Sequence, residues 1–175
     1  MGVFRTLIKA AVFVAVLAFA RYASMDKAFA SDMVSIDRGR YVVKIASCNN
    51  CHTPGYIPMA GKVEERLWLT GSPVGYRGEW GTTYAANLRL YMERLSEDQW
   101  VTTARTIMTR PPMAWFVLQN MSDHDLRSIY RYIRYLGPAG ETAPAFLPPG
   151  QEPNNPYIVF PRQWSDSVQH AMTRD

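Results

Sequence analysis

The sequence predicts a mostly α-helical domain followed by an extended, proline-rich arm. Two helices begin at recognisable capping signals, and small and apolar residues at helical spacing indicate a third. After these helices, between Gly137 and Pro161, seven prolines interrupt any helical pattern. We therefore expect a leader at residues 1–30, a folded domain at residues 31–137 and the arm at residues 138–175.

The leader has the composition of an export signal. Two basic residues precede an unbroken apolar run of eleven residues, Ala10 to Ala20. This run has the length of the hydrophobic region of a secretory signal peptide and falls short of the roughly 20 residues that cross a bilayer. Small-residue cleavage patterns end at Ala20 and at Ala30, and the second is favoured; an uncleaved membrane anchor is the alternative. We expect the body of the protein to lie in the periplasm.

The basic character of the chain belongs largely to this leader. The whole chain carries a formal charge of +4. Residues 1–30 hold four of the 19 basic residues and one of the 15 acidic ones, so the remainder is nearly neutral. Nucleic-acid binding proteins instead concentrate positive charge on the folded domain. We therefore expect no nucleic-acid partner.

The helices can be placed from periodicity and caps. The first covers about residues 36–46, where Ile36, Gly39, Val43 and Ala46 share one face and Gly39 permits close approach of another helix. Ser96 to Gln99 forms a capping box that opens a helix from about Glu97 to Arg110. Ser122 caps a further helix that ends at Gly137.

Two stretches lack helical periodicity. Residues 53–95 are rich in glycine and predict loops with a short hairpin, folded over whatever the domain binds. In the arm, Tyr157, Ile158 and Phe160 suggest docking onto the body. Arg127, Arg131 and Arg134 share the polar face of the last helix, which predicts a solvated surface or, as the alternative, a docking patch for an acidic partner.

The only two cysteines lie in one motif, Cys48-Asn49-Asn50-Cys51-His52. This spacing makes a strained, reducible disulfide that is typical of redox enzymes rather than a structural one, and no βαβ pattern supports a thioredoxin-like site. A zinc site needs a second pair of ligands, but His124 and His170 stand alone.

Attachment of a haem accounts for all three residues. Two thiols at this spacing add across the two vinyl groups of a haem, and the adjacent histidine then ligates the iron. The motif therefore predicts one covalently bound haem c, with Cys48 and Cys51 as its attachment points and His52 as an axial ligand.

Met113 is the favoured second axial ligand. Pro111 and Pro112 hold the preceding chain extended, so the methionine is expected on a stiff loop that Trp115 and Phe116 seal against water. Met121 is the second choice. Met108 is expected on the preceding helix, and His124 in solvent. Trp68, Trp80, Tyr84 and Asn87 are candidate partners of the haem propionates, although ordinary packing is the default for each.

These motifs resemble the class I c-type cytochromes, and most closely the cytochrome c subunits and domains of bacterial membrane-associated alcohol, aldehyde and sugar-acid dehydrogenases. The likeness covers residues 36–137 and is carried by Arg38-Gly39-Arg40-Tyr41, Cys51-His52-Thr53-Pro54-Gly55, Ala86-Asn87-Leu88 and Arg110-Pro111-Pro112-Met113. One feature departs from the class: many members have a proline about a dozen residues after the histidine, whose carbonyl orients the imidazole. Glu64 stands there in this chain, so the partner of His52 is open.

The resemblance implies a periplasmic electron carrier rather than an enzyme, with His52 and Met113 as axial ligands of an iron that cycles between Fe(II) and Fe(III). Its partners would be a donor dehydrogenase or respiratory membrane complex and an acceptor oxidase or cytochrome. Membrane association through a partner or through an uncleaved leader is compatible with this. Two alternatives stay open: a haem enzyme or gas-binding sensor with an open sixth position, and a relay subunit bound permanently in a larger redox complex.

Overall fold

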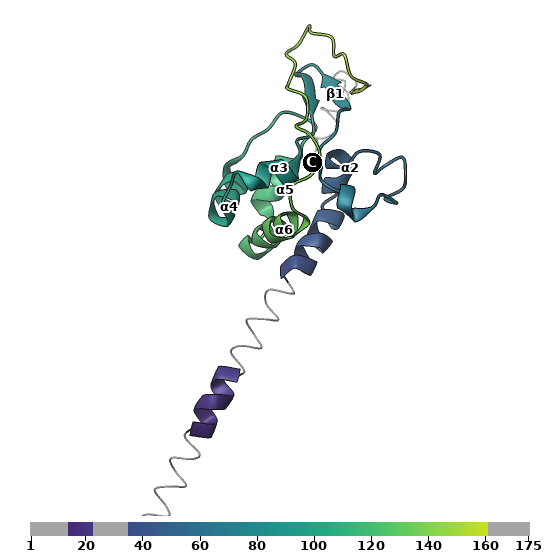
Figure 1. Ribbon diagram of the computed structural model, residues 1–175. Helices are drawn as coiled ribbons and strands as arrows, with labels where there is room; N and C mark the ends of the chain where they lie inside the picture. The colour runs from purple at the N-terminus through teal and green to yellow at the C-terminus, as the bar shows by residue number, and fades with distance from the viewer. Residues whose placement is uncertain (1–13, 23–34, 161–175) are drawn as a thin grey trace, which may run out of the picture.

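A computed structural model describes residues 14–22 and 35–160 of the chain (Figure 1). The body is α-rich and carries one three-stranded sheet, so the helix-rich class predicted from the sequence is confirmed. Most of the predicted leader, including the cleavage pattern at Ala30, lies outside the described residues, as does the arm beyond residue 160. No helix in the described part of the chain is long and apolar enough to span a membrane.

The helices gather in the lower part of the body, and the sheet lies above them in Figure 1. After a helical stretch at 14–22, the body begins with a helix at 35–45. The helices that follow are α2 (Cys48–His52), the short 3-10 helix η1 (Glu65–Leu67), α3 (Leu88–Glu93), α4 (Glu97–Thr106), α5 (Trp115–Asn120) and α6 (Asp123–Leu136). The strands are β1 (Gly75–Gly78), β2 (Gly81–Tyr84) and β3 (Tyr157–Val159).

Both predicted N-terminal caps are confirmed. Ser96 and Gln99 form the reciprocal capping box of α4, and the Ser122 hydroxyl accepts from the backbone N–H of Asp125 at the start of α6. The predicted end of α4 at Arg110 is wrong, because the helix stops at Thr106. Ile107 is extended, and its carbonyl accepts from the Gln119 side chain instead of continuing the helix. Residues 107–110 therefore belong to no helix or strand, and Met108 lies among them rather than on a helix.

The helix at 35–45 crosses α6 at Gly39. A Cβ atom at Gly39 would lie only 2.0 Å from the backbone oxygen of Ser128 and 2.7 Å from the Cβ of Tyr132. Ser128 is fully buried, and its hydroxyl lies 3.4 Å from that of Ser35. The prediction that Gly39 allows another helix to approach closely is confirmed, and α6 is that helix.

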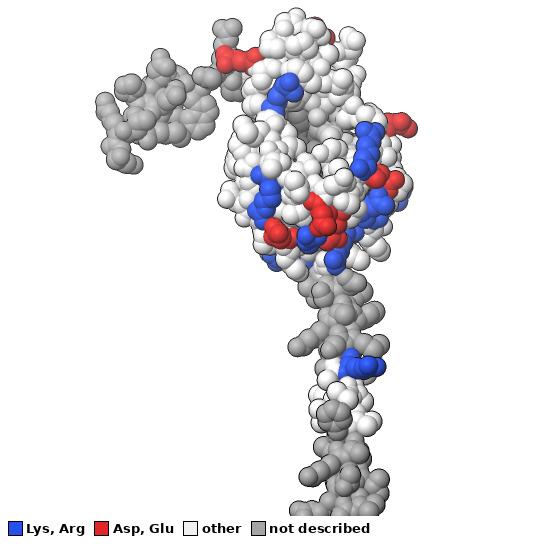
Figure 2. Space-filling model, turned by 90° about the vertical axis from the view of Figure 1, so that its left-hand side faces the viewer, with Lys and Arg blue, Asp and Glu red and all other residues white. Residues whose placement is uncertain are grey.

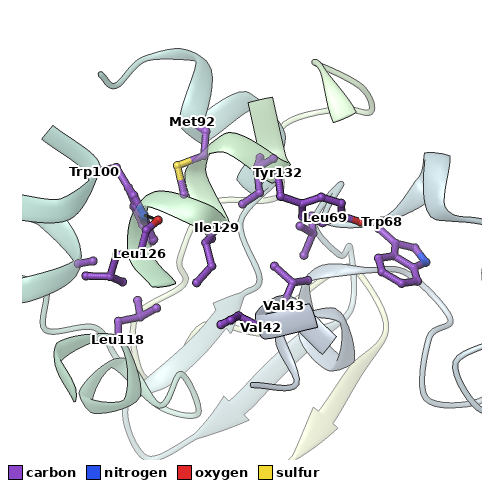
Figure 3. Close-up of a cluster of buried hydrophobic side chains, with 12 residues drawn as sticks. Val42, Val43, Trp68, Leu69, Met92, Trp100, Leu118, Leu126, Ile129 and Tyr132 are labelled. Atoms are coloured by element: carbon purple, nitrogen blue, oxygen red, sulfur yellow. Dashed lines mark hydrogen bonds between the residues drawn. The ribbon is translucent and has the colours of Figure 1, made fainter. Parts of the chain in front are cut away.

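The core lies between this helix and α3 to α6. Figure 3 shows Val42 and Val43 facing Ile129, with Trp100 of α4 next to Leu126 of α6. The indole Nε1 of Trp100 donates to the carbonyl of Leu126 over 2.8 Å, so this large ring is buried with its polar atom satisfied.

The polar face of α6 is not a free basic patch. Arg127 and Arg131 both bond the carboxylate of Glu97, and Arg134 pairs with Glu93. On the face in Figure 2, basic and acidic side chains are intermixed over the lower part of the body. The three arginine side chains are 38 to 41% exposed, so the predicted solvated face is confirmed, and each is also paired with a carboxylate of another helix; the docking patch for an acidic partner stays a prediction.

The arm docks through its backbone. In the sheet, β1 pairs antiparallel with β2, the predicted hairpin, and parallel with β3 from the arm. Leu147 adds a further antiparallel bridge to Thr82. Tyr157, Ile158 and Val159 stay exposed, so the expectation that the arm docks is confirmed, but Phe160, which contacts Tyr76 and Trp80, is the apolar anchor.

Arg89 fastens the start of this arm to the helices. The residue is 5% exposed, and its guanidinium donates to the carbonyls of Leu136 and Gly137 at the end of α6 and to the carbonyl of Arg66 at 2.7 Å. Burial lowers the pKa of Arg89 from its ordinary value, and the three carbonyls take the place of a counter-ion.

Replacing Arg89 with lysine is expected to lower the free energy of unfolding by about 2 kcal/mol. A single ammonium cannot reproduce the planar fork, so at least one buried carbonyl loses its donor. Urea unfolding followed by circular dichroism measures the change. The same substitution at Arg66, whose side chain is 72% exposed, is the control and is expected to change stability by less than about 0.5 kcal/mol. Equal stability of the two variants would contradict a supporting role for Arg89.

Candidate functional site

The short helix α2 brings the three residues of the cysteine motif onto one face. Cys48, Cys51 and His52 stand at positions i, i+3 and i+4, which are neighbours on a helix surface. Ser47, with φ of 59°, separates α2 from the helix at 35–45. The chain therefore turns between the first helix and the motif, just before Cys48.

Both cysteines are free, and the surroundings of Cys48 favour its protonated form, because burial raises the pKa of this thiol to about 11. Redox-active Cys-x-x-Cys motifs instead lower the pKa of the attacking thiol, so that it is a thiolate near neutral pH. This observation argues against a thioredoxin-like activity. Within the described residues, no three side chains of the types His, Cys, Asp and Glu gather to hold a metal ion.

The imidazole of His52 is held in one tautomer. Its Nδ1 lies 2.7 Å from the carbonyl oxygen of Ala86. Because a carbonyl only accepts, Nδ1 carries the proton, and Nε2 keeps its lone pair. Burial lowers the pKa of His52 and outweighs the opposite effect of the Ala86 carbonyl, so the ring is neutral at pH 7. A neutral imidazole with a fixed Nδ1–H and a free Nε2 is the form that ligates a metal.

Ala86 is the partner that sequence analysis left open. It lies between β2 and α3, and the following residue, Asn87, caps α3 by accepting from the backbone of Arg89 and Leu90. The Asn87 amide also donates to the carbonyls of Ala139 and Glu141 in the arm, at 2.8 and 3.1 Å. The Ala86-Asn87-Leu88 run is one of the stretches that resemble the class I c-type cytochromes, but nothing in the sequence indicated that the Ala86 carbonyl contacts His52.

Two adjoining cavities open onto this face of α2. One, of about 370 Å³, is lined chiefly by apolar side chains of the core, and the other, of about 780 Å³, lies between the hairpin, the 108–115 segment and the arm. Both sizes fall in the range of ligand-binding pockets. The residues that line both cavities are Cys51, His52, Ala86, Thr109, Pro112 and Met113.

Met113 lies on a loop, as predicted, and lines both cavities together with His52. The loop is held by a hydrogen bond from the Thr83 hydroxyl to the carbonyl of Pro111 (2.6 Å) and by a turn that joins Trp115 N–H to the Met113 carbonyl. Trp115 lines the larger cavity, whereas Phe116 is exposed. The structure thus brings the favoured thioether and the imidazole to the same cavities.

The other candidate ligands are less well situated. Met121 and the buried Met92 line only the smaller cavity, and Met108 lines only the larger one, with its side chain 76% exposed. His124 is exposed in the first turn of α6, as expected. Among the described methionines, Met113 alone lines both cavities.

Of the four propionate candidates, only Tyr84 lines a cavity that contains His52. The indole of Trp68 donates to the Val63 carbonyl, and the polar atoms of Asn87 are all engaged with the backbone. Trp80 packs on Phe160, away from both cavities.

Among the residues of the larger cavity to which the sequence assigned no ligand or propionate role are Tyr76, Arg110 and Phe146. Tyr76 lies beside Cys51, and burial together with this contact raises the pKa of its hydroxyl. Phe146 belongs to the arm, so the arm supplies a wall of the candidate site. No local pattern marks such a residue, because its place depends on where the arm folds back.

Comparison with known proteins identifies no relative. No family model matches the chain, and neither a curated protein nor a solved structure matches it.

Proposed function

We propose that this protein transfers electrons through one covalent haem c, attached to Cys48 and Cys51 and axially ligated by His52 and Met113. The observation that carries the proposal is the hydrogen bond between His52 Nδ1 and the Ala86 carbonyl. It supports a ligand role because it leaves the Nε2 lone pair of a neutral, buried imidazole free, next to two thiols on the same helix face.

The cavities fit a flat, largely apolar cofactor with polar groups at one edge. The smaller cavity is bounded by core residues such as Val43, Leu118 and Ile133. The larger one adds a hydroxyl and a guanidinium group from Tyr84 and Arg110. An imidazole and a thioether line both, which is the donor pair of six-coordinate electron-transfer haems.

The haem supplies a one-electron Fe(II)/Fe(III) couple, and the protein supplies its environment. His52 and Met113 would hold the iron in both oxidation states. The apolar walls would exclude water, and because a neutral thioether favours the ferrous state, this ligand would raise the potential. Covalent links to Cys48 and Cys51 would fix the orientation of the cofactor.

The partners we propose are redox proteins: a donor dehydrogenase or membrane complex, and an acceptor oxidase or cytochrome, with periplasmic transfer between them. An enzyme or gas sensor with an open sixth position is less well supported. A second histidine over the iron would support such a site, but His52 is the one histidine within residues 35–160 that lines either cavity.

The attachment is tested by replacing both Cys48 and Cys51 with serine in the full exported chain. The unmodified protein is expected to keep its haem after denaturation and acid–acetone treatment, whereas the double variant releases all of it. The spectrum of the extracted pigment and haem staining on a denaturing gel are the measurements. Asn50→Ser, which changes the same helix between the two thiols, is the control and should retain the haem.

An unmodified protein that contains no haem, or haem that acid–acetone extracts completely, would refute the covalent attachment. A high-spin ferric spectrum in the unmodified protein would refute the six-coordinate carrier, even if the haem is covalent. The two parts of the proposal can therefore fail separately.

A further inference from the structure

Arg110 is a cation of the larger cavity without a carboxylate partner in the described part of the chain. Most other arginines of the body pair with acidic side chains: Arg38, Arg40, Arg66, Arg77, Arg105, Arg127, Arg131 and Arg134. Arg110 instead lines the cavity that also contains His52 and Met113. A guanidinium left without an acid at the wall of a cavity is available to an anionic ligand.

The guanidinium is held in place by the arm. Its central carbon lies 3.8 Å from the centre of the Phe146 ring, which is close stacking of a cation on an aromatic face. Phe146 is fixed by its neighbour Leu147, whose backbone exchanges hydrogen bonds of 2.8 and 3.0 Å with Thr82. On the other side, Thr83 bonds the carbonyl of Pro111. The hairpin therefore anchors both Arg110 and the ring that it stacks on.

Resting on the proposed function, we propose that Arg110, held by Phe146 of the C-terminal arm, binds a propionate carboxylate of the haem. A carboxylate that enters a partly enclosed cavity loses hydration and needs a charged donor. A guanidinium stacked on a ring keeps the N–H groups at its edge free for bidentate bonding to a carboxylate. The arm, which lies outside the stretch that resembles cytochromes, is then part of the cofactor site.

A positive charge near the haem stabilises the reduced form, because reduction removes one positive charge from the iron. Replacing Arg110 with glutamine is therefore expected to shift the redox equilibrium three- to tenfold toward the ferric state; a tenfold shift corresponds to about 59 mV for one electron. Phe146→Leu keeps an apolar side chain but removes the stacking surface, so a smaller shift in the same direction is expected. Arg110→Lys keeps the charge and should shift the equilibrium least.

The experiment is a spectroelectrochemical titration of the full-length haem-loaded protein and its variants. Arg94→Gln is the matched control. Arg94 is also an arginine for which no carboxylate partner is found in the described part of the chain, but the cavity that it lines contains neither His52 nor Met113. The inference requires a larger shift for Arg110→Gln than for Arg94→Gln. Equal shifts, or none, would overturn it.

Two further results decide between rival roles. If Arg110→Gln leaves the potential unchanged and alters only the salt dependence of electron transfer to a partner, Arg110 is a docking residue and the inference is wrong. Arg110→Gln could also disturb ligation by the nearby Met113, which would be seen as loss of the weak long-wavelength charge-transfer band of Met–Fe(III). In that case the potential of Phe146→Leu decides. A shift of this potential toward the ferric state supports the inference, and an unchanged potential refutes it. Absence of covalent haem in the unmodified protein would overturn the proposed function as well.

Discussion

Replacing Met113 with alanine is expected to open the sixth coordination position and lower the reduction potential by about 0.1 V or more. Axial ligands set haem potentials over a range of roughly 0.8 V, and a thioether lies toward the high end because it favours ferrous iron. The ferric protein should lose its weak long-wavelength Met–Fe(III) band and become partly high-spin. Optical spectra and a redox titration measure both effects.

Met121→Ala is the matched control for this prediction. Met121 lines the apolar cavity but not the larger one, and it lies just after α5 rather than on the proline loop. The same truncation there removes a thioether near the site without removing the proposed ligand. If Met121→Ala abolishes the band and Met113→Ala preserves it, the assignment of the sixth ligand is wrong and the second choice made from the sequence is right.

The features that the sequence predicted well are those that depend on neighbouring residues. The caps at Ser96 and Ser122 satisfy N–H groups only three residues away, so a local pattern contains the whole interaction. The loop position of Met113 follows from two adjacent prolines in the same way. The cysteine motif is the extreme case, because one five-residue helix presents all three side chains.

The features that the sequence did not predict depend on contacts between distant segments. The carbonyl of Ala86 lies 34 residues beyond His52 in the chain, and a backbone carbonyl leaves no mark in residue type. The resemblance pointed to a proline position instead, which Glu64 occupies here. Only the turn after β2, held by the Asn87 cap, explains why this carbonyl meets the imidazole.

The early end of α4 has a similar cause. Pro111 has no N–H for the carbonyl of Ile107 and disfavours helical backbone at Arg110, so the helix cannot continue regularly to residue 110. Gln119 takes the carbonyl of Ile107, and Arg105 bonds the carbonyl of Gln119, which ties the end of α4 to α5. Because these partners come from another helix, periodicity within α4 could not reveal them.

Replacing Gly39 with valine is expected to prevent folding, and Gly39→Ala to lower the free energy of unfolding by about 3 kcal/mol. In an exposed helix, alanine is about 1 kcal/mol better than glycine, so propensity alone predicts the opposite sign. Here a Cβ would lie 2.0 Å from the Ser128 oxygen, and backbone atoms cannot turn aside as a flexible side chain does. The helices would have to separate, at the cost of overpacking a core whose total stability is only about 5–15 kcal/mol.

Thermal unfolding followed by far-ultraviolet circular dichroism tests the sign of the alanine effect. Lys44→Val is the control, because it introduces the same β-branched residue at an exposed position of the same helix. This substitution is expected to lower the free energy of unfolding by less than about 1 kcal/mol. An increase in Tm for Gly39→Ala would contradict the close crossing. A decrease in Tm for Gly39→Ala, together with reduced haem attachment in Gly39→Val, would show that the helix crossing supports the candidate site. The structural reason is that α6 positions the helix at 35–45, and that helix leads through Ser47 into α2 with Cys48, Cys51 and His52.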